Sequence, residues 1–213
     1  MSGKRKIFVL GILVLLLIAG GFFWWWKKEK GPSSVFEAIK FEPLENYVVK
    51  ETPEGKIVEN VHAGLEFKVP TGWNVKKITG PQAEEDYRKF GVSIFSTDME
   101  IDPETKLPRS GCNILIKIEY RPSERKFQVV KNLINEVQRT TSEEKKKRYE
   151  VIIVDGYQAL KETLFDDPKA GEDIYVQVPI GEKIYIFETI LVPKDKDRCF
   201  HAFDEFLKTV SIK

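Results

Sequence analysis

The chain has 213 residues, of which 42% are hydrophobic and 31% are charged, and its formal net charge is +1. That length suits one compact domain with an additional segment. Without residues 1–30 the chain retains 28 basic and 32 acidic residues, a net charge of −4. This balance argues against a nucleic-acid-binding domain, which would normally present a basic face.

Residues 7–26 form an unbroken apolar run, IFVLGILVLLLIAGGFFWWW, with no charged or polar side chain apart from its indole N–H groups. An α-helix of this length spans roughly 30 Å, the thickness of the hydrocarbon core of a bilayer. Trp24–Trp26 suit a membrane–water interface, and Lys27 and Lys28 follow as charges that would face the headgroups. The run predicts a transmembrane helix that contacts the membrane.

A cleaved secretory signal is the alternative for the same run. Its apolar core would be only about 7–15 residues long and would end at a small-x-small site. Ala19-Gly20-Gly21 has the small residues, but large aromatic residues follow and prolong the apolar run. No cysteine lies nearby, which excludes a lipoprotein anchor, so we expect an uncleaved signal anchor.

Basic residues on both sides of the span determine the expected orientation. Three precede it and three follow it, and the free amine and Glu29 tip the positive-inside bias toward an inside N-terminus. We predict a cytoplasmic N-terminus at 1–6, the signal anchor at 7–26, a tether at 27–45 and an extracytoplasmic domain at 46–213. The predicted location is the cell membrane, crossed once, with the soluble domain outside the cytoplasm.

Strand patterns begin at Tyr47. Residues 47–50 and 56–59 flank Thr52-Pro53-Glu54-Gly55, in which Pro and Gly supply the dihedrals of a hairpin turn. Residues 65–69 alternate apolar and polar side chains, the period of a half-buried strand. Further strands are expected at residues 92–96, 113–120, 149–154, 159–165, 174–179 and 183–192.

The segment AGLEFKVPTGW, residues 63–73, ends its alternation at a turn. In Val69-Pro70-Thr71-Gly72 proline is second and glycine fourth, the preference of a type I turn. Trp73 and Val75 would continue into the next strand, where Trp73 would bury a large area against the helices. We therefore interpret Trp73 as a core anchor and not as the lip of a binding site.

Two amphipathic helices are predicted from apolar residues at spacings of three, four and three. The first, which Ser123 can cap, carries Phe127, Val130, Ile134 and Val137. The last, with Asp195 or Asp197 as its cap, carries Phe200, Phe203, Leu207 and Val210. Each helix has one apolar face and should lie on a sheet. The predicted fold is α+β, an α-β-α sandwich with a mainly antiparallel central sheet, preceded by one transmembrane helix.

Candidate groups for catalysis are few. His62 and His201 are the two histidines, and Cys199 and His201 would point roughly 200° apart on a helix. We expect both histidines to be partly exposed or packing residues, and we expect no catalytic residue and no cofactor. An oxidising compartment would permit a disulfide between Cys112 and Cys199, but two separate small core residues fit the sequence equally well.

Clustered charges occur in two acidic loops and one basic run. The carboxylates are Asp98, Glu100, Asp102 and Glu104 in one loop, and Asp166, Asp167, Glu172 and Asp173 in the other. Neither loop has the spacing of an EF-hand, and zinc would need clustered Cys and His, so we expect solvated surface and no metal. Beside Glu143 and Glu144, the run Lys145–Arg148 is interpreted as a solvated helix end or loop, not as a basic recognition patch.

Two short motifs resemble those of the PsbP-like superfamily, which includes the extrinsic photosystem II subunit PsbP, bacterial PsbP-like lipoproteins and a group of Ran-binding factors. The opening motif matches Gly64, Phe67, Pro70, Gly72 and Trp73, and the closing motif matches Phe203, Phe206, Thr209 and Val210. The resemblance covers residues 60–213 and implies an α-β-α sandwich with a binding or assembly role and no enzyme activity. The uncleaved anchor departs from the photosynthetic branch, so oxygen-evolving function is not transferred, and no functional residue of that branch matches a position here.

The expected function is that of a membrane-anchored, non-catalytic domain for protein interaction or assembly of an envelope complex. The expected partner is an envelope protein, and no nucleic acid is expected. Two alternatives stay open: an extracytoplasmic hydrolase that uses the acidic-loop carboxylates, and a small-ligand or calcium-binding module.

Overall fold

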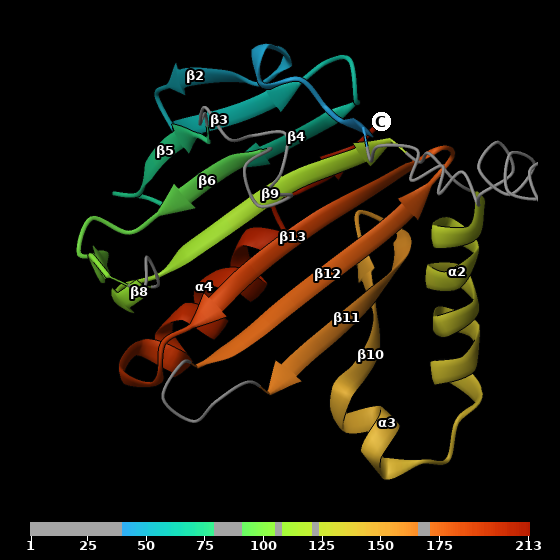
Figure 1. Cartoon of the computed structure of the whole chain (residues 1–213). Helices are drawn as coiled ribbons and strands as arrows, with labels where there is room; N and C mark the ends of the chain where they lie inside the picture. Colours follow the sequence, from blue (N-terminus) through green and yellow to red (C-terminus); the bar gives the residue numbers. More distant parts are fainter. Residues whose placement is uncertain (1–39, 79–90, 105–107, 121–123, 166–170) are drawn as a thin grey trace, which may run out of the picture. The chain divides into compact units, whose positions relative to one another are not determined.

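The computed structural model of the chain describes residues 40–78, 91–104, 108–120, 124–165 and 171–213 (Figure 1). The predicted transmembrane span lies outside these ranges. Across the five described ranges, no helix is long and apolar enough to cross a membrane.

Strands dominate the described residues, and three α-helices accompany them. The N-terminal part contains β1 (Lys40–Phe41), 3-10 helix η1 (Leu44–Asn46), β2 (Val48–Thr52), β3 (Gly55–Asn60), β4 (Leu65–Lys68), β5 (Asn74–Lys77), β6 (Val92–Phe95), β7 (Glu100–Ile101), β8 (Pro108–Ser110) and β9 (Asn113–Tyr120). The C-terminal part contains α2 (Glu124–Arg139), α3 (Glu143–Arg148), β10 (Tyr149–Val154), β11 (Tyr157–Phe165), β12 (Glu172–Ile180), β13 (Lys183–Leu191), 3-10 helix η3 (Pro193–Asp195), α4 (Lys196–Leu207) and β14 (Ser211–Ile212).

The main sheet has the strand order β10-β11-β12-β13-β9-β6-β5, with β1 paired to β9 (Figure 1). A second sheet has the order β14-β4-β3-β2, and β7 pairs with β8. Every strand pair in the described residues is antiparallel. The prediction of an α+β fold with a mainly antiparallel sheet is confirmed.

Alternate residues of β13 enter two different cores, because successive side chains of a strand point to opposite faces. Ile184 and Ile186 pack in one cluster with Phe127, Val130 and Ile134 of α2. Their neighbours on the other face pack in a second cluster with α4 and the smaller sheet, a cluster that includes Tyr185, Phe187, Phe203 and Phe206. Helices α2 and α4 therefore cover opposite faces of the main sheet.

Phe206 joins the two sheets through its ring contacts. Its ring centroid lies 5.4 Å from that of Phe67 in β4 and 5.8 Å from that of Phe187 in β13, both with edge-on geometry. Such aromatic pairs contribute about 0.5–1.5 kcal/mol beyond the area they bury. Phe206 of α4 thus holds the smaller sheet against the larger one.

The turn after β4 differs by one residue from its prediction. The backbone N–H of Trp73 donates to the carbonyl of Pro70 at 3.0 Å, so the turn spans Pro70–Trp73 and not Val69–Gly72. Gly72 then occupies the third position with φ +79°, which a type II turn requires and a type I turn does not. Trp73 packs partly buried against the core, as an anchor of the fold.

The last helix ends earlier than predicted. It stops at Leu207, and Val210 is buried beyond it. The Thr209 backbone N–H and hydroxyl both donate to the Phe206 carbonyl, at 2.9 and 2.8 Å, and this turn leads into β14. Beyond this turn Ser211 and Ile212 pair with β4, which satisfies backbone groups at the end of the chain.

Cys112 and Cys199 form a disulfide, which decides between the two readings that the sequence left open. The bond joins the residue before β9 to α4, across 87 residues of sequence, with the two Cα atoms 5.2 Å apart. Both cysteines are buried in the core between the sheet and α4.

Candidate functional site

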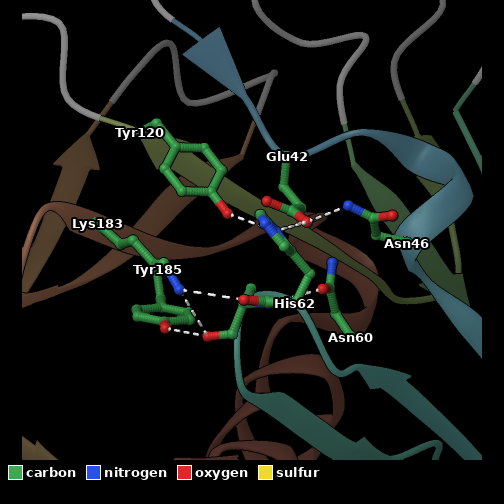
Figure 2. Close-up of polar contacts among 8 residues, drawn as sticks. Glu42, Asn46, Asn60, His62, Tyr120, Lys183 and Tyr185 are labelled. Carbon is green, nitrogen blue, oxygen red and sulfur yellow. Dashed lines mark hydrogen bonds and ion pairs between the residues drawn. The ribbon is translucent and has the colours of Figure 1, made fainter.

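A polar cluster forms where residues 42–46, the turn between β3 and β4, and the ends of β9 and β13 meet (Figure 2). We call it the Glu42 cluster. Its members are Glu42, Asn46, Asn60, His62, Tyr120, Lys183 and Tyr185. The Glu42 side chain is buried and its Oε1 accepts a hydrogen bond from Asn46 Nδ2 at 2.6 Å.

His62 links the buried carboxylate to a tyrosine. Its Nδ1 lies 2.9 Å from Glu42 Oε1 and 2.8 Å from the Tyr120 hydroxyl oxygen, although the imidazole is largely exposed (Figure 2). The sequence predicted a partly exposed histidine, and the structure adds a carboxylate partner. No signal could have found that partner, because Glu42 lies 20 residues away in a segment assigned to the tether.

Side chains of neighbouring strands hold the backbone of the turn that carries His62. Asn60 Oδ1 accepts from the Ala63 N–H at 2.9 Å. The Ala63 carbonyl accepts from the Tyr185 hydroxyl at 2.5 Å and from Lys183 Nζ at 3.2 Å. Side chains of β3 and β13, one strand from each sheet, therefore fix the backbone beside the imidazole.

The environment changes the acidity of three members of the cluster. Burial alone would raise the pKa of Glu42, but hydrogen bonds from Tyr120, Asn46 and His62 outweigh it, so the pKa lies below its ordinary value. Burial and the adjacent Glu42 carboxylate raise the pKa of Tyr120, and burial raises that of Tyr185 to about 12. At neutral pH Glu42 is therefore a carboxylate, held by the Tyr120 hydroxyl, the Asn46 amide and the His62 ring.

The Glu42 cluster fastens residues 40–46 to the body of the domain. β1 pairs with β9, and the Glu42 N–H donates to the Ile118 carbonyl at 2.9 Å. The sequence assigned residues 40–45 to the tether, whereas the structure has β1 and the 3-10 helix η1 in residues 40–46.

The remaining candidates for catalysis lie apart from this cluster. His201 is exposed on α4. The disulfide uses both thiols, so no cysteine is free to act as a nucleophile beside either histidine.

Carboxylates of the acidic loops are divided among separate cations. Asp98 pairs with Arg198 at 2.8 Å, and Asp102 pairs with Arg109 at 2.6 Å. Hydrogen bonds from Ser96 and Arg198 lower the pKa of Asp98. Asp166 and Asp167 lie outside the described residues. Among the residues that are described, no group of three or more His, Cys, Asp or Glu could hold a metal ion.

The basic run at residues 145–148 forms helix α3, which buries none of its side chains, as predicted for a solvated helix end. Three of its residues nevertheless line a cavity of about 490 Å³, which we call the basic pocket. The lining consists of Lys146, Lys147, Arg148, Tyr149, Glu150, Lys161, Thr163, Glu172, Ile174, Lys196, Asp197 and Phe200. Glu172, the one acidic-loop carboxylate in this lining, pairs with Lys196 at 2.5 Å.

No family model matches the chain, and no curated protein matches it in sequence. Solved structures that are similar include a Bacteroides thetaiotaomicron protein at 6% identity and a TM-score of 0.41, over 70% of this chain and 45% of that one. This chain thus spans about half the length of that protein. LpqN, involved in cell envelope biogenesis of Mycobacterium tuberculosis, is 12% identical with a TM-score of 0.41, over 70% of this chain and 83% of LpqN.

Cyanobacterial PsbP from Synechocystis is similar over 79% of this chain and 93% of its own, with 14% identity and a TM-score of 0.41. The solved structures similar to this chain include a PsbP, a member of the superfamily that the opening and closing motifs resemble.

Proposed function

We propose that the chain is a non-catalytic extracytoplasmic domain, held at the membrane by residues 7–26, that binds another envelope protein. The disulfide between Cys112 and Cys199 supports the compartment, because cytosolic thiols are kept reduced in most organisms. The apolar span supports the anchor.

The observation that carries the binding proposal is the edge of the main sheet at β10. β10 is the last strand in the order, and within the described residues no further strand pairs with its outer edge. Its sequence after Glu150 is Val-Ile-Ile-Val, and the side chain of Ile153 is 64% exposed. Edge strands are usually blunted by charge, as β2 is by Lys50 and Glu51, and β10 lacks charge over this run.

An extended segment of the partner fits such an edge. Main-chain hydrogen bonds to the free edge would provide affinity, and an apolar partner side chain over Ile153 would provide specificity. The partner of this proposal is therefore an envelope protein with an exposed apolar β-strand or an unstructured apolar segment.

Purification of the tagged full-length chain from native membranes tests the proposal. Ile153→Asp places a charge on the edge and is expected to abolish co-purification of the partner. Val61→Asp is the matched control, since Val61 is also an exposed aliphatic residue, at 77%, but lies in the turn after β3. The proposal is wrong if both variants retain the partner equally, or if the domain turns over a defined substrate.

A further inference from the structure

The basic pocket concentrates positive charge on a domain of opposite sign. Its lining holds five cationic and three carboxylate side chains, a balance of +2. Residues 31–213 together carry a net charge of −4. The positive charge of the pocket therefore does not follow from the overall composition of residues 31–213, which is acidic.

The cations come from three separate parts of the chain. Lys146, Lys147 and Arg148 lie in α3. Lys161 lies in β11, and Lys196 is the first residue of α4. One cavity is therefore lined by α3, by β10, β11 and β12 of the main sheet, and by the first turns of α4. A solvated helix end alone would not gather lysines from two other elements.

Lys161 is the least exposed cation of the pocket. Its side chain is 11% exposed, its Nζ lies 3.5 Å from Glu150 Oε2, and it stands 4.7 Å from the centre of the Phe200 ring. The ring and the carboxylate thus hold the ammonium group at the wall of the cavity. Glu150 itself is largely exposed and can move away when a stronger anion enters.

The existing ion pairs leave capacity for a further anion. Arg148 donates to Glu162 Oε1 through Nε at 3.1 Å and Nη2 at 2.8 Å. Lys147 has no carboxylate partner among the described residues. Exposed ion pairs of this kind contribute about 0–1 kcal/mol each, so a multivalent anion can displace a pocket carboxylate.

We propose that the basic pocket binds a phosphate group attached to an apolar or aromatic body. A phosphate monoester carries about two negative charges at neutral pH and a phosphodiester carries one, and the several acceptor oxygens of either group suit clustered lysines. Phe200, Tyr149 and Ile174 supply apolar wall for the rest of the ligand. The cavity volume lies within the range of small-molecule sites. A soluble phosphorylated compound and a phospholipid headgroup share this chemistry.

Calorimetry on the full-length chain in neutral detergent tests the site, with two probes. Inorganic pyrophosphate represents the soluble source. Short-chain phosphatidylglycerol added to the micelles represents the headgroup, with short-chain phosphatidylcholine as its control. Saturable binding of pyrophosphate or of phosphatidylglycerol is expected, together with a rise in the melting temperature.

Two pocket variants and one matched control distinguish binding in the pocket from nonspecific electrostatic attraction. Lys146→Gln/Lys147→Gln alters only exposed side chains and Lys161→Gln alters the wall; each is expected to weaken binding at least about tenfold. Lys50→Gln/Lys68→Gln removes two exposed lysines of the smaller sheet and should leave affinity unchanged. Equal weakening by the control, or no saturable binding of either probe, would overturn the proposal. Because β10 edge variants do not enter this experiment, its outcome is separate from that of the envelope-partner proposal.

Discussion

At Glu42, three hydrogen-bonding side chains outweigh the burial of the carboxyl group, and the pKa falls below its ordinary value of 4.5. A group whose pKa is lowered on folding stabilises the folded state above its unfolded pKa. That contribution disappears as the pH falls below 4.5 and through the folded pKa.

Glu42→Gln is therefore expected to lower the free energy of unfolding at pH 7 by about 1–3 kcal/mol, because a charged acceptor is lost. The variant should also lose stability less steeply than the wild type below pH 4.5. Urea denaturation at pH values from about 3 to 7 measures both effects, because carboxyl groups ordinarily titrate within this range. Glu144→Gln, at an exposed position of α3, is the control; parallel acid curves for Glu42→Gln and the wild type would contradict this role.

Two buried tyrosines provide a matched pair. The Tyr185 hydroxyl donates to the Ala63 carbonyl at 2.5 Å, whereas the buried Tyr47 hydroxyl has no hydrogen-bond partner among the described residues. Tyr185→Phe should cost about 1–3 kcal/mol, because the Ala63 carbonyl loses a donor. Tyr47→Phe should be close to neutral. Chemical denaturation compares the two, and equal losses would mean that the Tyr47 hydroxyl has a bound partner such as water.

At the scale of elements, glycines of the PsbP-like opening motif set the turns on either side of β4. Gly72 has φ +79° and a Cβ there would meet no atom within 4 Å, so Gly72→Ala should cost only the backbone strain, about 1–2 kcal/mol. Gly64 has φ +74°, and a Cβ would lie 2.3 Å from the Lys213 carbonyl oxygen. Gly64→Ala should therefore cost more, because it also displaces β14. Equilibrium denaturation measures the loss of stability in both variants. Equal losses would be evidence against the close approach of Gly64 to the Lys213 carbonyl.

Local sequence patterns predicted most helices and strands. They failed where an element forms only by pairing with residues distant in the sequence. Alternation correctly predicted β4, with Leu65 and Phe67 buried, and helical spacing predicted the stripe of α2. In α4 the spacing was right for Phe203 and Leu207 and wrong for Phe200, which is 37% exposed. β1 was missed, because it pairs with β9 some 80 residues away and has no pattern of its own. The end of α4 was misplaced for the same reason: the pairing of Ile212 with Leu65 overrides the apolar spacing.

The candidate sites depended on distant residues even more. His62 was visible in the sequence, but its partner Glu42 was not. The basic run of α3 was visible as well, but Lys161 and Lys196 join it only through the order of β10, β11 and β12 and the position of α4. A charged run in the sequence therefore identifies only those pocket residues that are adjacent along the chain.

At the scale of the whole molecule, the disulfide joins the main sheet to the helix that holds the smaller sheet. Replacement of Cys112 and Cys199 by serine together should lower the free energy of unfolding by about 2–5 kcal/mol, since the bond closes a long loop in the unfolded chain. Denaturation with and without reductant measures the difference. Reductant should destabilise the wild type and leave the double variant unchanged; an effect of reductant on the double variant would contradict this assignment.

In the proposed interaction, the edge of β10 contacts an envelope protein. The most direct test of this interaction replaces Ile153 with a photo-crosslinking amino acid in the full-length chain and irradiates intact cells, with the same replacement at Val61 for comparison. A cross-link to one envelope protein is expected from position 153, and no cross-link to that protein is expected from position 61. Cross-linking of the same proteins from both positions, or of none from position 153, would contradict it.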